Sequence, residues 1–372
     1  MAASICDVLP AAAALLAVPH ATDALNLTES VGEVRRVVVL LVDGMGWHLL
    51  PEMAPSAPLL ASVWARAAGR LDELVCTFPS TTPTSLASLG TGVGPGRHGL
   101  LGFTLNVPGT ARVLTHIFWR DDPPPAQWQP VPTWFERLRA SGVDARAVLP
   151  APFVGSGLTE AAYRGAQFCP VDHNDDYGRA VCEQVSASAG LVYAYTSALD
   201  TAAHLFGVGS AEWHAAAGYV DALLTRMLDA LPSDAVLLVT ADHGGLNIAA
   251  DARVDLDTDP PLSAGVRLVA GEPRVRYLHT ESGAAPDVIA TWAEVLAGRA
   301  DVLGRDDAVA AGLFGQVRPE HLARIGDVVV ICHDDLAVLA SRHEPPEVAQ
   351  LVGMHGGATP VEMAIPLITL RR

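Results

Sequence analysis

Three short runs of aliphatic residues constrain the fold of this chain more than any other feature. They are Arg36–Val42, Leu191–Tyr195 and Ala235–Thr240, and each is followed within a few residues by an aspartate. Uninterrupted apolar runs are typical of strands that are buried on both faces of a parallel sheet. With 372 residues, half of them hydrophobic, the chain is long enough to bury such a sheet beneath helices. The sequence therefore predicts an α/β fold.

Acidic and imidazole side chains follow these predicted strands. Asp43 comes directly after the first run, and Asp242 and His243 come just after the third, before two glycines. Asp200 and His204 follow the second run and are four residues apart, so one helical face could direct both at a single ion. Open α/β sheets bind ligands at the carboxyl ends of their strands. The alternative is structural: Asp43 and Asp242 cap turns or helices, His243 is a core residue, and the Asp–His pair stabilises an ordinary helix.

A hydroxyl-rich stretch, Phe78–Gly92, contains the candidate nucleophile. Thr82 occupies an expected helix N-cap position and Pro83 the first helical position, where its missing N–H costs nothing. A hydroxyl at a helix N-terminus lies among free backbone N–H groups, in a site suited to phosphate. Read by itself, the stretch favours an ordinary capped helix, and it is the acids and histidines elsewhere in the chain that point to a reactive hydroxyl. Near the C-terminus, His355 stands beside two glycines, where a histidine is usually a turn residue.

Together these positions provide three acids, three histidines and one hydroxyl, an inventory that suits two divalent cations. The seven residues are Asp43, Thr82, Asp200, His204, Asp242, His243 and His355. Mixed nitrogen and oxygen ligands favour zinc first, with manganese or iron as alternatives. Two such ions can clamp the attacking and leaving oxygens of a phosphoryl transfer, and one of them would activate the Thr82 hydroxyl.

The order of these motifs resembles that of the alkaline phosphatase superfamily, and most closely its type I phosphodiesterase / nucleotide pyrophosphatase branch. The resemblance runs from about Val37 to the C-terminus. Its motifs are Val42-Asp43-Gly44, Phe78-Pro79-Ser80-Thr81-Thr82-Pro83, Thr91-Gly92, His98-Gly99, Asp200 with His204, Thr240-Ala241-Asp242-His243-Gly244 and His355-Gly356-Gly357.

The resemblance implies a fold, a ligand set and a mechanism. The fold is an alkaline-phosphatase-like three-layer sandwich: a mostly parallel central sheet flanked by helices, with a small α+β lobe inserted before the last histidine. One zinc would be held by Asp200, His204 and His355. The other would be held by Asp43, Asp242, His243 and the Thr82 oxygen. Thr82 would attack phosphorus to form a phospho-threonine that water then hydrolyses.

The sequence changes character between residues 250 and 345. Short strand-like runs such as Val266–Ala270 and Val328–Cys332 alternate there with turns and with a predicted helix, Pro286–Leu296. We therefore expect residues 1–249 and 346–372 to form the catalytic core, and residues 250–345 to form the inserted lobe.

The expected activity is hydrolysis of phosphodiester or pyrophosphate bonds in a small, nucleotide-like substrate. Phosphodiesterases of this branch usually place an asparagine a few residues after the His-Gly pair, where this chain has Phe103. Asn106 and Thr104 are the candidate replacements, and Phe103 and Asn106 are the expected substrate-binding residues. Two alternatives remain open: a phosphomonoesterase or phosphonate hydrolase on the same metal site, and a non-catalytic metal-dependent binding protein.

Composition restricts the partners. A net charge of −17 argues against nucleic-acid polymers and anionic membranes, which require basic surfaces. The five cysteines include no C-x-x-C pair, which disfavours a disulfide framework. The apolar stretch Ala11–Val18 is short and lacks a basic start, which disfavours a signal peptide. We expect a cytoplasmic protein, and the sequence leaves its oligomeric state open. His173 lies in an acidic stretch and is expected in a solvated loop rather than in a metal site.

Overall fold

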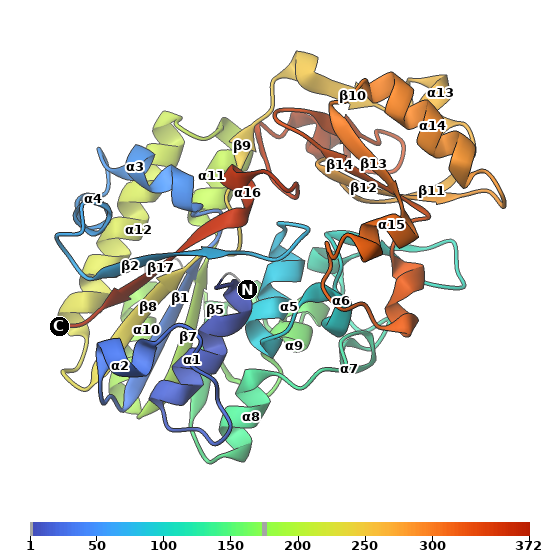
Figure 1. Cartoon of the computed structure of the whole chain (residues 1–372). Helices are drawn as coiled ribbons and strands as arrows, with labels where there is room; N and C mark the ends of the chain where they lie inside the picture. Colours follow the sequence, from blue (N-terminus) through green and yellow to red (C-terminus); the bar gives the residue numbers. More distant parts are fainter. Residues whose placement is uncertain (1–2, 173–176) are drawn as a thin grey trace.

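The computed structural model describes residues 3–172 and 177–372, so His173 lies outside the described residues. Its central feature is a seven-stranded sheet with the order β2-β17-β8-β1-β7-β5-β6 (Figure 1). The strands are β1 (Arg36–Val42), β2 (Arg70–Val75), β5 (Ala145–Pro150), β6 (Gln167–Val171), β7 (Gly190–Thr196), β8 (Ala235–Thr240) and β17 (Ala364–Leu370). Strand β17 runs antiparallel to both of its neighbours, β2 and β8, and the other pairs of neighbouring strands in this sheet are parallel. The three predicted aliphatic strands are β1, β7 and β8, and every residue of β7 and β8 is buried.

Helices cover both faces of this sheet. One group packs together around α5, the helix that begins at the hydroxyl-rich stretch, and the other packs around α12, the longest helix. The first group comprises α1 (Val8–Leu15), α5 (Thr82–Thr91), α8 (Trp134–Ala140) and α9 (Gly157–Tyr163), and the second comprises α4 (Pro58–Trp64), α10 (Tyr177–Ala187), α11 (Ala198–Phe206) and α12 (Ala211–Ala230). The predicted three-layer sandwich with a mostly parallel sheet is confirmed.

Residues 250–345 contain a second, four-stranded antiparallel sheet with the order β11-β12-β14-β13 (upper right in Figure 1). These strands are β11 (Val266–Glu272), β12 (Val275–Thr280), β13 (Ala300–Gly304) and β14 (Val328–Cys332). Helix α14 (Ala285–Leu296) packs against β13 and β14, and Trp292 is buried in a hydrophobic cluster separate from the main core. The exact division of the chain at residues 250 and 345 stays a prediction.

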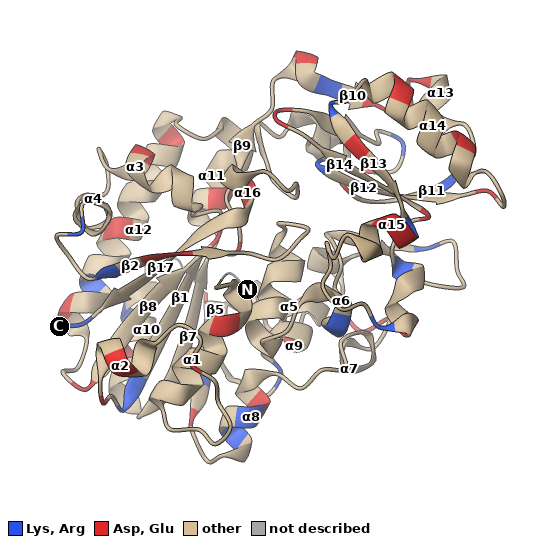
Figure 2. Cartoon of the chain, in the orientation of Figure 1, with Lys and Arg blue, Asp and Glu red and all other residues tan. Residues whose placement is uncertain are grey.

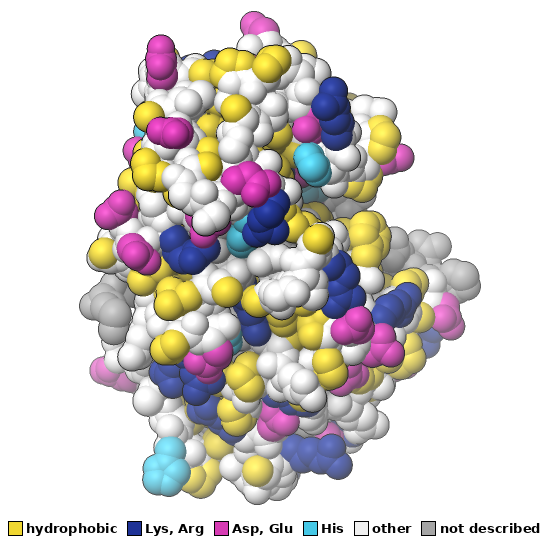
Figure 3. Space-filling model, turned by 90° about the vertical axis from the view of Figure 1, so that its right-hand side faces the viewer, with side chains coloured by type: hydrophobic (Ala, Val, Ile, Leu, Met, Phe, Trp, Pro, Cys, Tyr) yellow, Lys and Arg dark blue, Asp and Glu magenta, His cyan; other side chains and the backbone are white. Residues whose placement is uncertain are grey.

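Charged residues are distributed over both parts of the molecule. Figure 2 shows Lys and Arg interspersed with Asp and Glu among the described residues. On the face shown in Figure 3, hydrophobic side chains reach the surface between charged ones, including across the middle of the view. No helix in the described part of the chain is both long and apolar enough to cross a membrane.

Candidate active site

The three central strands bring three aspartates to one edge of the sheet. Strands β8, β1 and β7 are neighbours, and their pairing aligns Leu41 with Thr240 and Val42 with Thr196, so their carboxyl ends are level. Asp43 follows β1 directly, and Asp242 follows β8 after one alanine. Asp200 lies in the first turn of α11, which begins just after β7. Adjacent parallel strands therefore place these carboxylates together, as the sequence predicts.

Two short backbone pairings bring His355 and Thr82 to the same edge. Strand β16 (Gly353–Met354) pairs with β9 (Leu246–Asn247), the segment just after Asp242 and His243. Ser80 bridges to Gly356, with its N–H donating to the Gly356 carbonyl at 3.2 Å. Helix α5 then begins at Thr82, and Thr81 is its N-cap. The expected N-cap role of Thr82 is thus wrong by one residue, because two consecutive threonines offer the same side-chain chemistry.

The first half of the site, which we call the buried group, consists of Asp43, Asp242 and His243. Their exposed fractions are 3%, 0% and 0%. His243 Nε2 lies 3.4 Å from Asp43 Oδ1 and 3.6 Å from Asp242 Oδ2. Thr82 Oγ1 lies 3.2 Å from the same nitrogen. The hydroxyl therefore sits at the edge of a cluster made of two carboxylates and one imidazole.

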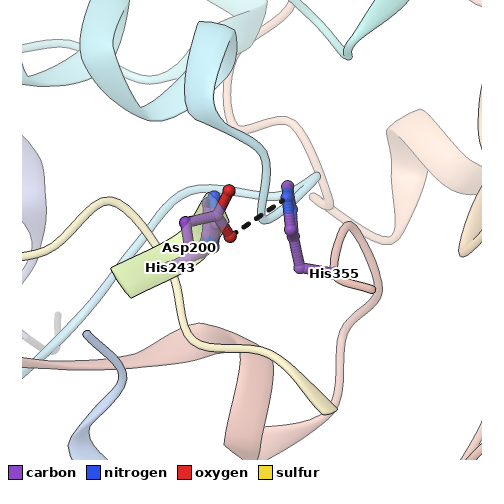
Figure 4. Close-up of side chains that lie close together, drawn as sticks. All are labelled: Asp200, His243 and His355. Atoms are coloured by element: carbon purple, nitrogen blue, oxygen red, sulfur yellow. Dashed lines mark ion pairs between the residues drawn. The ribbon is translucent and has the colours of Figure 1, made fainter. Parts of the chain in front are cut away.

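The second half, the open group, consists of Asp200, His204 and His355, all partly exposed. His204 Nε2 is 3.1 Å from Asp200 Oδ2, and His355 Nε2 is 3.9 Å from Asp200 Oδ1. The His355 ring stacks on that of His243 with centroids 3.6 Å apart. Figure 4 shows Asp200 and His355 pointing toward one another beside His243. The two groups are therefore in contact and form one site.

All three imidazoles are oriented by backbone carbonyls. His204 Nδ1 lies 2.7 Å from the Gly353 carbonyl, His243 Nδ1 2.8 Å from that of Gly244, and His355 Nδ1 2.9 Å from that of Ser80. Each Nδ1–H donates to its carbonyl, which leaves Nε2 facing the carboxylates as the atom available to a metal ion. Metal-binding histidines are commonly fixed in this way.

The crowding of carboxylates shifts several pKa values. Burial, followed by the negative charges of Asp242 and Asp200, raises the pKa of Asp43 well above its usual range. Burial also raises the pKa of Asp242. Burial by itself would lower the pKa of His204, but the Asp200 carboxylate outweighs it and raises that pKa to about 9. The site therefore carries more negative charge than its histidines neutralise, and it favours the binding of cations.

The donor set fits divalent metal ions. Asp43 Oδ1 and Asp242 Oδ2 are buried and have no hydrogen-bond partner among the described residues. One ligand atom from each of Asp43, Asp242 and His243 lies within 4.8 Å of the others, and the same holds for Asp200, His243 and His355. Unpartnered buried carboxylate oxygens beside imidazole nitrogens are typical metal ligands. All seven residues of the predicted inventory thus come together at one edge of the sheet.

Comparison with known proteins identifies the family. The sequence profile of the Type I phosphodiesterase / nucleotide pyrophosphatase family matches residues 37–358. The chain belongs to this family. It is accordingly a hydrolase, and the resemblance in the motifs is confirmed. The family is a di-metal enzyme class, in agreement with the paired ligand groups. A sequence search of curated proteins found no match.

Solved structures share the fold at low sequence identity. Murine ectonucleotide pyrophosphatase / phosphodiesterase 5 is 17% identical, with a TM-score of 0.73 over 90% of this chain and 88% of that one. An inactive variant of the same mouse protein, in complex with AMP, matches at 16% identity and a TM-score of 0.73, covering 91% and 88% of the two chains. Phosphonoacetate hydrolase from Sinorhizobium meliloti 1021, in complex with phosphonoacetate, is 19% identical with a TM-score of 0.68, covering 91% and 90%.

Two cavities adjoin the site of this family member. The smaller cavity, of about 190 Å³, is lined by residues that include Thr82, Phe118, Phe153 and Tyr195. The larger cavity, of about 740 Å³, lies between the main-sheet region and β11, and His204, His355 and Phe103 are among its lining residues. Phe103 thus lines a cavity that is large enough for a small substrate. Asn106 is not among the lining residues of either cavity: its Nδ2 donates to the Ala323 carbonyl at 3.2 Å, a placement that does not favour its predicted substrate contact.

Sequence reasoning missed two further residues of the site. The Tyr195 hydroxyl donates a hydrogen bond to Asp43 Oδ2, although Tyr195 reads in the sequence only as the end of an apolar strand. Glu272, at the end of β11, lines the larger cavity and is 5% exposed. Burial raises the pKa of Glu272 to about 8. The only sequence signal for Glu272 is an acid at the end of an apolar strand, next to the Gly-Glu-Pro turn.

Proposed function

We propose that this protein hydrolyses phosphodiester or pyrophosphate bonds of a small, nucleotide-like molecule, with Thr82 as the nucleophile. The observation that supports this most directly is the position of Thr82 Oγ1, 3.2 Å from His243 Nε2 and at the start of α5. A threonine hydroxyl is a weak nucleophile unless a base or a metal ion activates it. Relatives offer further support: the family is named for this chemistry, and a mouse neighbour in the fold binds AMP.

The proposed cofactors are two divalent cations, with zinc first among them. Asp43, Asp242, His243 and the Thr82 oxygen would hold one cation, and Asp200, His204 and His355 the other. When bound, such ions lower the pKa of a coordinated hydroxyl and neutralise charge that develops on a leaving oxygen. Three imidazole nitrogens with carboxylate oxygens suit zinc better than magnesium or calcium, which prefer oxygen ligands alone.

The chain's own residues would act in two displacement steps. In the first, the Thr82 hydroxyl gives its proton to water and forms an Oγ–P bond while the bond from phosphorus to the leaving oxygen breaks. The leaving oxygen takes a proton from water. In the second, a water molecule attacks phosphorus, the Oγ–P bond breaks and Thr82 recovers a proton. One water is consumed for each ester bond cleaved.

A second candidate function is phosphonate or phosphomonoester hydrolysis on the same site. It is favoured by the likeness to phosphonoacetate hydrolase and by Phe103, which replaces the asparagine usual in the diesterases. A cleavage assay separates the two candidates. We expect the zinc-loaded protein to prefer bis(p-nitrophenyl) phosphate over p-nitrophenyl phosphate and phosphonoacetate. A hundredfold preference for either of the latter would reject diester hydrolysis as the function.

Substitution of Thr82 tests the nucleophile. Thr82→Ala should lower kcat by roughly a thousandfold or more, while Thr82→Ser, which keeps a hydroxyl, should retain measurable turnover. Both variants should bind two zinc ions per chain, as measured by elemental analysis. A Thr82→Ala enzyme within tenfold of the wild type would exclude the phospho-threonine. The cytoplasmic location, the exclusion of nucleic-acid polymers and the absence of membrane association stay predictions.

A further inference from the structure

We propose that the larger cavity receives the leaving group of the substrate and that this leaving group is bulky and mainly apolar. This inference rests on the proposed function, because it assumes a diester or pyrophosphate with two organic groups. It adds which group occupies which cavity and what chemistry the leaving group has.

The first observation is the spatial order of the site residues. Thr82 Oγ1 contacts His243, the His243 ring stacks on that of His355, and the His355 ring centroid is 5.1 Å from that of His204. Thr82 lines the smaller cavity, whereas His204 and His355 line the larger one. The larger cavity therefore opens at the end of this series that is remote from the nucleophile.

The direction in which the leaving group departs follows from the geometry of phosphoryl transfer. The attacking and leaving oxygens lie roughly in line on opposite sides of phosphorus. With Thr82 at one end, the leaving oxygen must depart toward the His204 and His355 end, where the larger cavity begins. The organic group that stays on phosphorus is then left with the smaller cavity beside Thr82.

The second observation concerns the join between the larger cavity and the reaction centre. Glu272 lies at this join: a Cβ on Gly356 would come within 2.6 Å of Glu272 Cδ, so the carboxyl packs against the residue after His355. Glu272 Oε1 is buried and has no hydrogen-bond partner in the described parts of the chain. The cavity is therefore continuous with the site and has an unused polar atom at its inner end.

The walls indicate the chemistry of the leaving group. Most residues around the larger cavity are apolar, among them Phe103, Val113, Val269, Val348, Leu351 and Met354. Ile117 and Phe118 line both cavities and are 45% and 73% exposed. Large apolar side chains exposed at cavity walls are typical of a binding surface for an apolar ligand. About 740 Å³ is room for a group larger than a single ring, whereas about 190 Å³ suits a compact group.

Three synthetic diesters test the assignment, because the aryl oxide is the better leaving group in each. They are phenyl methyl phosphate, 4-biphenylyl methyl phosphate and phenyl 2-(4-biphenylyl)ethyl phosphate. The second carries the added ring on the leaving group, and the third carries a biphenyl on the retained group. For the zinc-loaded wild type we expect kcat/KM to rise roughly tenfold or more from the first to the second, and to stay level or fall for the third. An equal or larger rise for the third would overturn the inference.

A matched pair of valine variants locates the effect. Val348→Trp narrows the larger cavity and should reduce the preference for the biphenylyl leaving group at least several-fold. Val295→Trp changes an exposed residue of α14 outside both cavities and should leave the activity and the preference unchanged. A Val348→Trp enzyme with the full preference would also overturn the inference. If Val348→Trp does not fold, the comparison of the three diesters with the wild-type enzyme still tests the inference.

The outcomes separate this inference from the proposed function. Hydrolysis of all three diesters without a leaving-group preference would reject the cavity assignment and leave the diesterase function in place. Turnover of phenyl phosphate or a phosphonate, but of none of the diesters, would reject the proposed function and the cavity assignment with it.

Discussion

The buried group and the open group use the same residue types in different surroundings. Asp43, Asp242 and His243 project from strand ends and are almost completely enclosed. Asp200 and His204 project from a helix, and His204 and His355 line the larger cavity. A buried ligand set is held by the core of the fold, whereas an open one can exchange water and substrate. The difference supports our proposal that the buried group holds the nucleophile and that the open group faces the departing part of the substrate.

Electrostatics sharpens this contrast. In the buried group the two aspartates repel one another, and each pKa is raised above its usual range, with burial as the largest cause. In the open group Asp200 has a histidine partner, and the charge of His204 overcomes burial to hold the pKa of Asp200 below its usual range. Without cations the buried group is therefore a source of instability, while the open group is internally paired.

The largest effect is expected from Asp242→Asn in the buried group. Loss of a carboxylate ligand should lower kcat/KM by roughly a thousandfold or more, since the proposed cation at Thr82 would contribute several kcal/mol of charge stabilisation. In a chelator at pH 7.5 the same variant should be more stable than the wild type, with the Tm raised by about 2 °C or more. The raised pKa of Asp242 means that its charge costs stability as pH rises through the interval between the unfolded and folded pKa values. The amide removes that charge.

Calorimetry across pH provides the control for Asp242→Asn. The gain in Tm should shrink as pH is lowered, because the wild-type carboxyl then becomes protonated and neutral. A lower Tm for the variant at pH 7.5 in chelator would contradict the view that repulsion dominates the metal-free buried group.

In the open group, His204→Ala should have a smaller effect. Water can replace a lost ligand at a partly exposed position, so we expect a decrease of about 100-fold in kcat/KM that excess zinc partly restores. His333→Ala is a matched control, because His333 Nε2 lies 3.2 Å from Asp301 Oδ2 in an exposed pair away from the site. A steady-state zinc titration of both variants measures the difference. If His204→Ala lowered kcat/KM as much as Asp242→Asn and zinc restored none of the loss, the contrast between the groups would not hold.

The sequence was sufficient to predict that Asp43, Asp200 and Asp242 lie close together, because the signals for these acids are local. Thr82 and His355 entered the prediction only through the combined inventory and the order of the motifs. An apolar run followed by an acid fixes a strand and its carboxyl end, and adjacent parallel strands bring such ends together. Outside the strands, the spacing of residues along the sequence predicted their positions in the site less well. Asn106 lies in the short hairpin of β3 (Thr104–Asn106) and β4 (Val113–Thr115), where its position follows from how the hairpin packs against the segment around Ala323.

Tyr195 and Glu272 could not be predicted for a related reason. Their roles depend on contacts between residues far apart in the chain: Tyr195 with Asp43, and Glu272 with Gly356. Gly356 illustrates the point, because its φ of +122° and the close Glu272 carboxyl both exclude a side chain there. The sequence shows the glycine but not the partner that makes it necessary.

Tyr195→Phe tests how strongly the surroundings fix the buried group. Removing the hydroxyl takes a hydrogen-bond donor from Asp43, and we expect about a tenfold weaker zinc affinity with little change in Tm. Competition with a chromogenic chelator measures the affinity. Tyr277→Phe is the control, because its hydroxyl donates to the Leu101 carbonyl at 2.6 Å and not to a carboxylate ligand. Equal zinc affinities for Tyr195→Phe and Tyr277→Phe would show that the hydroxyl does not tune the ligand.

The smallest expected effect concerns Glu272 and depends on pH. Burial raises the pKa of Glu272 from 4.5 to about 8. In metal-free protein at a pH between these two values, the folded state therefore keeps a proton on Glu272 that the unfolded state has lost. Stability therefore falls as pH rises from 4.5 to 8, and Glu272→Gln should remove that loss. We expect the variant to raise the Tm by about 2 °C or more at pH 9 and to change it little at pH 4.5. Glu347→Gln, an exposed position on the same cavity, should show no such dependence on pH. Parallel changes in both variants would mean that the effect comes from the net negative charge of the cavity and not from burial of Glu272.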